Sequence, residues 1–156
     1  LYVAGNSCLL VGQEKKSDEY YSILAEVPGW AEKVHLYRST FCFENRLFEK
    51  ALLYARLAER EKPQDSSILY HLSLCYSSVG EKERALEIVR RLDDRPHWLD
   101  YYRFTLERDA GKDAEATETL LTMPPAYFED PEELEAALDF ARQQKDLRLL
   151  RHLKNK

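Results

Sequence analysis

The sequence predicts an all-α chain, built as a right-handed α-solenoid of stacked antiparallel helix pairs. Three observations support this prediction. Strong helix formers dominate the chain, and β-branched runs are nearly absent. Apolar residues recur at helical spacing within several segments. This pattern of small and apolar residues then repeats along the chain, first at intervals of 34 residues.

Two segments display the helical pattern most clearly. Residues 45–63, "NRLFEKALLYARLAEREKP", carry one apolar face, and the predicted helix stops before Pro63. Residues 81–94, "EKERALEIVRRLDD", have the same pattern. Superposing the two faces puts Ala51 on Ala85, 34 residues apart. The faces consist of Leu47, Ala51, Tyr54, Ala55 and Ala58 in the first segment, and of Ala85, Ile88, Val89 and Leu92 in the second.

The pattern extends along the chain in register. A small anchor residue follows each turn residue by five positions, and apolar residues come four and seven positions after the anchor. Glycine tolerates the positive φ of a tight turn, and a small anchor lets paired helices pack closely. The turns are Gly12, Arg46, Gly80 and Gly111, the last after a step shortened to 31 residues, and the anchors are Ser17, Ala51, Ala85 and Ala116. A weaker final copy contains Ala136, Phe140 and Leu149.

The period divides the chain into five helix pairs within a single domain. We expect approximate bounds of 1–31, 32–65, 66–96, 97–127 and 130–156, with the last pair acting as a cap. The sequence opens "LYVAGNSCLL", without an initiator Met and partway into a first helix. We therefore interpret the chain as a fragment of a longer protein.

The period and spacing resemble the tetratricopeptide repeat (TPR) family, whose unit is a helix–turn–helix of about 34 residues. The best match is "LYHLSLCYSSVGEKERALEIV" (69–89), and the resemblance covers roughly residues 1 to 153. Ser17 stands where alanine is usual and Arg46 where glycine is usual, which bears on local turn geometry. The residues at the family's spacing in the best match are Leu69, Leu72, Tyr76, Gly80, Ala85 and Val89.

The resemblance implies a concave groove, lined by the first helix of each pair, that binds peptides or partner helices. The position ten residues before each turn is expected to face it, as is the position four residues later. Aromatic and leucine side chains there suit an apolar or amphipathic segment of a protein partner. The alternative is that several of them pack between helices as core. The predicted groove residues are Tyr2, Leu36, Thr40, Phe43, Tyr70, Leu74, Trp98, Tyr101 and Thr105, with Asn6, Leu134 and Leu138 at the remaining equivalent positions.

One TPR subfamily grips a C-terminal carboxylate with lysine, asparagine and arginine side chains. The corresponding positions here hold Leu36, Thr40, His71, Trp98 and Tyr102, so the carboxylate-clamp pattern is missing. We expect a scaffold or chaperone-like module that binds a protein or peptide. Two alternatives stay open. One is a structural repeat segment of a larger assembly or secretion protein, with self-association through terminal helices. The other is a regulatory repeat domain attached to an enzyme outside this chain.

Composition and motifs narrow the function classes. Of the 156 residues, 44% are hydrophobic and 33% charged, which is typical of a folded globular chain. The net charge of −5 argues against nucleic acid as a partner, because phosphate binding needs a concentrated basic surface. No run of about 18 apolar residues occurs, so we expect no direct membrane insertion. Three cysteines without a C-x-x-C pair favour a reducing, cytoplasmic location.

The sequence gives no indication of a catalytic, metal or cofactor site. Cys8 and Cys42 share one repeat position, Cys75 falls one residue short of its next copy, and we interpret all three as core. His71 precedes Cys75 by four residues, but no third metal ligand or acid accompanies the pair. Glycine-rich phosphate loops, G-x-S-x-G and H-E-x-x-H are missing as well. We expect no enzyme activity and no cofactor.

The C-terminal end is divided by charge. Residues 128–139 carry six acids and no base, whereas residues 142–156 carry six Lys/Arg and one acid. Acids at a helix start and bases near a chain end complement helix dipoles, so solvated faces are the simpler interpretation. The alternative is a basic tail that docks on an acidic partner.

Overall fold

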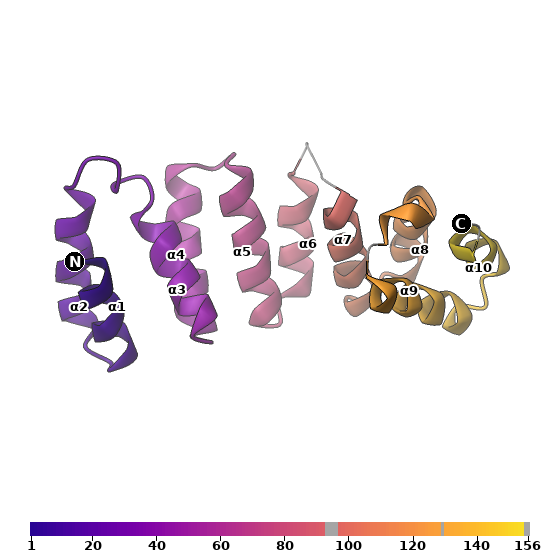
Figure 1. Cartoon of the computed structure of the whole chain (residues 1–156), viewed down its shortest axis with the longest axis horizontal. Helices are drawn as coiled ribbons and strands as arrows, with labels where there is room; N and C mark the ends of the chain where they lie inside the picture. The colour runs from indigo at the N-terminus through magenta and orange to yellow at the C-terminus, as the bar shows by residue number, and fades with distance from the viewer. Residues whose placement is uncertain (93–96, 129, 155–156) are drawn as a thin grey trace. The chain divides into compact units, whose positions relative to one another are not determined.

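The computed structural model describes residues 1–92, 97–128 and 130–154. This part of the chain contains ten α-helices, one short 3-10 helix and no strand, which confirms the all-α prediction (Figure 1). The helices are α1 (Tyr2–Leu10), α2 (Glu14–Ala25), α3 (Val34–Glu44), α4 (Phe48–Glu61), α5 (Ser66–Ser78), α6 (Lys82–Arg90), α7 (His97–Asp109), α8 (Asp113–Thr122), η1 (Pro125–Tyr127), α9 (Pro131–Gln143) and α10 (Leu147–Lys154).

The chain divides into two units, Leu1–Ile88 (unit 1) and Val89–Lys156 (unit 2), and the boundary lies within α6. In unit 1, α1 packs on α2, α3 on α4 and α4 on α5, with smaller contacts from α3 to α2 and α5. In unit 2, α7 packs on α8, and α10 packs on α9 and α8. Neighbouring helices therefore pack against each other as the repeat predicts. The stacking of all five pairs into one solenoid stays a prediction, and the repeat boundary at residue 96 lies outside the described residues.

A single turn geometry joins the two helices of each predicted pair. After α1, the Gly12 amide donates to the Leu9 carbonyl at 3.2 Å, and the Gln13 amide donates to the Cys8 carbonyl at 2.8 Å. These two bonds define a Schellman motif, which satisfies carbonyls left open at a helix end. The same pair of bonds recurs wherever the turn residue has positive φ between paired helices, at Gly12, Arg46, Gly80, Gly111 and Lys145.

Two of these turn residues are not glycine, yet both adopt the left-handed conformation. Arg46 has φ 60°, so the departure from glycine leaves the turn geometry intact. Lys145 has φ 54° and forms the last turn, which the sequence pattern did not identify. A side chain at such φ is unfavourable by about 1–2 kcal/mol. Packing of the flanking helices therefore holds these two turns in place.

The small anchors are confirmed as buried contact points. Ser17, Ala51, Ala85 and Ala116 are all 0% exposed. The apolar residues four and seven positions later are buried too: Tyr21 and Leu24, Ala55 and Ala58, Val89 and Leu92, and Leu120 and Met123. In the final copy, Phe140 and Leu149 are buried, but Ala136 is only half-buried.

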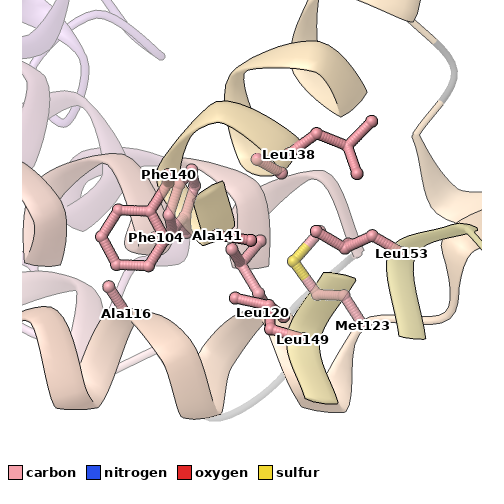
Figure 2. Close-up of a cluster of buried hydrophobic side chains, with 10 residues drawn as sticks. Phe104, Ala116, Leu120, Met123, Leu138, Phe140, Ala141, Leu149 and Leu153 are labelled. Atoms are coloured by element: carbon pink, nitrogen blue, oxygen red, sulfur yellow. The ribbon is translucent and has the colours of Figure 1, made fainter. Parts of the chain in front are cut away.

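Unit 2 has its own hydrophobic core, drawn in Figure 2. Phe104 from α7 is completely buried, and its ring lies 5.3 Å from the ring of Phe140 on α9. Leucines from α8 and α10 complete the cluster, whose remaining buried members are Ala116, Leu120, Met123, Ala137, Leu138, Ala141, Leu149 and Leu153.

Candidate functional site

The predicted groove residues share one degree of exposure. Every one of the eight whose side chain is described is half-buried: Tyr2, Leu36, Thr40, Phe43, Tyr70, Leu74, Tyr101 and Thr105. Trp98 lies in α7, but its side chain is outside the described part of the chain. At the equivalent positions, Asn6 and Leu138 are buried instead. Apart from Asn6 and Leu138, the described residues at these positions are therefore partly buried and partly exposed at the surface.

Two of these residues line a pocket that α3 and α5 form in unit 1. Its volume is about 380 Å³. Leu36, Tyr37 and Thr40 contribute from α3, and Ile68, which is 2% exposed, contributes from α5. The Thr40 hydroxyl donates to the Leu36 carbonyl at 3.0 Å, so its hydrogen-bonding need is met within its own helix. The other lining residues are polar: Glu32, Lys33, Lys62, Asp65 and Ser67.

Most of the charged groups at this pocket already have partners. Lys62 Nζ donates to Glu32 Oε2 at 2.6 Å, and this hydrogen bond lowers the pKa of Glu32 and raises the pKa of Lys62. The Asp65 carboxylate accepts the Ser67 and Ile68 amides at 2.9 and 3.1 Å, capping the start of α5. Within the described residues, no acid lies in ion-pair contact with the Lys33 ammonium.

An aromatic cluster borders the pocket. The Tyr2 ring lies 5.8 Å from Trp30 and 6.1 Å from Tyr37, and Trp30 lies 5.4 Å from Tyr37. Tyr37 belongs to both the cluster and the pocket and is 43% exposed. Sequence reasoning missed Trp30 and Tyr37. Trp30 lies between helices and Tyr37 one position beyond Leu36, so the repeat spacing could not select either.

Phe43 on α3 and Tyr70 on α5 are two further half-buried residues of these helices. The Phe43 ring lies 5.6 Å from His71 on α5 and 5.5 Å from Phe48 on α4. Burial raises the pKa of the Tyr70 phenol above its ordinary value. Phe43 thus serves the packing of α3 on its neighbours as well as the surface, as the core alternative allowed.

The predicted groove residues of unit 2 lie at the edge of its core. The Tyr101 ring is 5.7 Å from Phe104 and 6.1 Å from Phe128. The Thr105 hydroxyl donates to the Tyr102 carbonyl at 2.7 Å, within α7. Truncating Tyr101 would therefore disturb the core of unit 2, and unit 1 offers the cleaner positions for testing binding.

A buried arginine joins α2, α3 and α4 in unit 1, and sequence reasoning missed it. Arg38 is 5% exposed, and its guanidinium donates to Asp18 at 2.6 Å and to Ser17 at 3.3 Å. The guanidinium carbon lies 4.5 Å from the Tyr21 ring centroid and 4.0 Å from that of Tyr54. Arg38 Nε has no hydrogen-bond partner among the described residues. Stacking on two neutral rings therefore offsets part of the cost of burying this charge.

Unit 2 contains a buried acid that was also missed. Glu107 is 0% exposed, accepts a hydrogen bond from Arg103 Nε at 2.7 Å and another from the Thr119 hydroxyl at 2.6 Å. It occupies the repeat position that holds Cys8 and Cys42 earlier in the chain. Both oxygens are therefore satisfied, and the carboxylate links α7 to α8.

His71 and Cys75 meet Ser39 between α3 and α5. Ser39 Oγ lies 2.8 Å from His71 Nε2, and Cys75 Sγ lies 3.6 Å from the same nitrogen. The Ser39 hydroxyl donates its proton to the Ala51 carbonyl at 2.6 Å, so His71 Nε2 must carry the hydrogen of the bond to Ser39. That nitrogen cannot then accept the thiol proton. Burial also lowers the pKa of His71 and raises the pKa of Cys75 to about 11, the reverse of an activated thiol.

We expect the three thiols to differ in reactivity. Cys42 and Cys75 are completely buried, and burial raises the pKa of both, whereas Cys8 is only half-buried. Titration of the native chain with an aromatic disulfide reagent at mildly alkaline pH should modify Cys8 first. The other two should react only when guanidinium unfolds the chain. Fast labelling that survives in Cys8→Ser would contradict the core interpretation.

The basic C-terminal segment binds acids of its own unit. Arg142 Nη1 contacts Glu135 at 2.8 Å and Asp139 at 2.5 Å, and Arg148 contacts Glu118 at 3.0 Å. All of these side chains are exposed, and such pairs contribute about 0–1 kcal/mol each. This arrangement agrees with solvated faces. Docking of the tail on an acidic partner stays a prediction, and Lys156 lies outside the described residues.

Helix α1 leaves an apolar face uncovered in unit 1. It carries no charged residue, and Val3 and Leu10 are 74% and 55% exposed. Gly5 lies on the opposite side, where a Cβ would come within 2.9 Å of the Tyr21 ring. Self-association through terminal helices stays a prediction, which a light-scattering measurement of mass against concentration would test.

The described residues contain neither a metal-binding cluster nor a membrane-spanning helix. No group of three or more His, Cys, Asp or Glu side chains there could hold a metal ion. None of the described helices is long and apolar enough to cross a membrane. In comparisons with known proteins, no family model and no curated protein matches the chain.

Proposed function

We propose that this chain is a non-catalytic protein-interaction module that binds an apolar or amphipathic segment of a partner protein, as a scaffold or chaperone does. The TPR relationship and the solenoid arrangement belong to the same proposal. The observation that carries it is the pocket of about 380 Å³ between α3 and α5. Its lining includes Leu36 and Thr40, which the repeat spacing selects for exposure to a ligand.

The proposed mechanism is presentation of a preformed surface. The pocket lies between two helices that each pack on α4, and Ile68 is held in the core at 2% exposure. A ligand then bears most of the ordering entropy, because the receptor loses little freedom on binding. Tyr37 and Trp30 add aromatic area beside the pocket, the kind of side chain that most often anchors interfaces.

A binding role fits the polar groups of unit 1 better than catalysis does. The one Cys–His contact described there, between Cys75 and His71, has a histidine tautomer that cannot take the thiol proton. Arg38 is enclosed by tyrosine rings rather than directed into the pocket lining. Chemistry performed by another part of a longer protein would leave this proposal unchanged.

Thr40→Arg tests the proposal. An arginine there fills the pocket, and the helix should tolerate it because the threonine is half-buried and bonds only within α3. Ser22→Arg, at an exposed position of α2 outside the pocket, is the matched control. Wild type, Thr40→Arg and Ser22→Arg would each be used for affinity capture from native extract, read by mass spectrometry, with circular dichroism to verify helicity.

Proteins retained by wild type and Ser22→Arg but lost with Thr40→Arg are the expected result. Recovery of the same proteins by all three chains would contradict a binding surface at α3 and α5.

A further inference from the structure

The pocket in unit 1 has charged residues as well as apolar ones, and their arrangement indicates which charge a ligand should carry. Leu36, Tyr37, Thr40 and Ile68 offer it carbon surface, which favours insertion of an apolar side chain. Four charged residues line the same pocket, two acids and two lysines, so the formal sum is zero. The four charged groups differ, however, in the bonds that they already form within unit 1.

Both acids are engaged by groups of unit 1. Asp65 caps α5 through the amides of Ser67 and Ile68, and Glu32 accepts from Lys62 at 2.6 Å. A basic partner would have to compete with these bonds. Lys33 differs, because it is exposed and no described acid lies within ion-pair distance of its ammonium, although its charge helps to lower the pKa of the neighbouring Glu32. The group left to meet a ligand's charge is therefore a cation at the margin of an apolar pocket.

We propose, building on the function proposed above, that the pocket takes an aliphatic side chain of the partner segment and that Lys33 pairs with an acidic side chain close to it in the partner's sequence. The recognised element is thus an internal acidic–aliphatic motif. One lysine suits one side-chain carboxylate.

Selection of random peptides displayed on phage tests this proposal without a known partner. The peptides are fused through their C-terminal ends, so that none has a free terminal carboxylate, and a second library leaves that end free. Each library is selected on the whole chain as wild type, Lys33→Glu, Lys16→Glu and Leu36→Arg. Lys16 is an exposed lysine outside this pocket and serves as the matched control, and Leu36→Arg blocks the apolar wall.

Wild type should enrich peptides with Asp or Glu within two positions of Leu, Ile, Val or Met. Preference for the acid should be about two- to fivefold, the range expected of an exposed ion pair. Lys33→Glu should lose that preference and favour Lys or Arg instead, while Lys16→Glu should behave as wild type.

Each contrary outcome identifies what fails. This inference would be overturned, and the binding function left intact, by either of two results. The peptides that require Leu36 could lack acidic residues, or the Lys33→Glu chain could select the same acidic peptides as wild type. Acid enrichment confined to the free-end library would overturn it in favour of a terminal carboxylate. If the wild-type chain enriches no peptide that the Leu36→Arg chain does not also enrich, the proposed binding function is contradicted as well.

Discussion

Replacing Arg38 by alanine is expected to lower the free energy of unfolding of unit 1 by about 2–4 kcal/mol. The substitution removes a side chain that is 5% exposed and stacked between Tyr21 and Tyr54. The two rings lose their common neighbour and a cavity opens between α2, α3 and α4. Burial raises the pKa of Tyr21 and raises that of Tyr54 to about 12, so both phenols are neutral and the loss is one of packing and stacking.

Arg38→Met separates packing from charge. Methionine keeps most of the side-chain volume and removes a guanidinium whose Nε is unpartnered among the described residues. Replacing a buried charge by an apolar side chain of similar size is often neutral, so we expect a change within about 1 kcal/mol of wild type. Asp18 would lose its partner, but its side chain is 61% exposed and water can take over.

Urea unfolding followed by circular dichroism measures both substitutions, and hydrogen exchange with mass spectrometry locates the effect. For Arg38→Ala, the largest loss of protection should fall in α2, α3 and α4. If Arg38→Met is as destabilising as Arg38→Ala, the hydrogen bonds of the guanidinium matter more than its packing, and our account of this residue is wrong.

Replacing Phe104 by alanine is expected to cost unit 2 about 3–5 kcal/mol. Phe104 is 0% exposed and touches two aromatic neighbours, Phe140 at 5.3 Å and Tyr101 at 5.7 Å between ring centroids. Figure 2 places its ring beside Phe140 and near Ala116, where alanine would leave a ring-sized void. Few side chains in the cluster could move to fill it, because helix packing holds their backbones.

Phe104→Leu is the matched control, since it keeps an apolar side chain of nearly sufficient volume. We expect it to cost less than about 1.5 kcal/mol. The same unfolding and exchange measurements apply, now with the largest loss of protection in α7, α8 and α9. A loss below about 1 kcal/mol for Phe104→Ala would mean that unit 2 is not organised around this ring.

The repeat could be predicted from local sequence because each of its positions has a strict physical requirement. The anchor must be small, and Ser17, Ala51, Ala85 and Ala116 are all 0% exposed. The turn favours glycine, which located three of the five Schellman motifs, while Arg46 followed from the period alone. Lys145 escaped prediction because lysine carries no turn preference and the final copy lacks a small buried anchor.

The candidate site was predicted in outline only. Repeat spacing selected half-buried positions, among them Leu36 and Thr40. It could not identify Lys33, Tyr37 or Ile68 as neighbours of these residues, since the pocket depends on how α5 packs beside α3. Spacing also put Asn6 on the groove, whereas Asn6 is buried and accepts a hydrogen bond from the Tyr21 hydroxyl.

The helices, four of the five turns and the buried face of the second helix in the first four pairs could be predicted from the sequence, because these features depend on residues close together in the chain. Which polar groups are enclosed, and which stay available to a ligand, depends on how the helices pack. Arg38 and Glu107 look like surface residues in the sequence. Residues 16 to 21 positions away enclose and bond Arg38, while Glu107 is bonded by Arg103, four positions before it, and by Thr119, twelve positions after it. Lys33 looks no different from any other lysine, and it stands out only because the acids beside it are bound elsewhere. Burial and pairing depend largely on contacts between residues far apart in the chain, which the local spacing of residue types cannot predict.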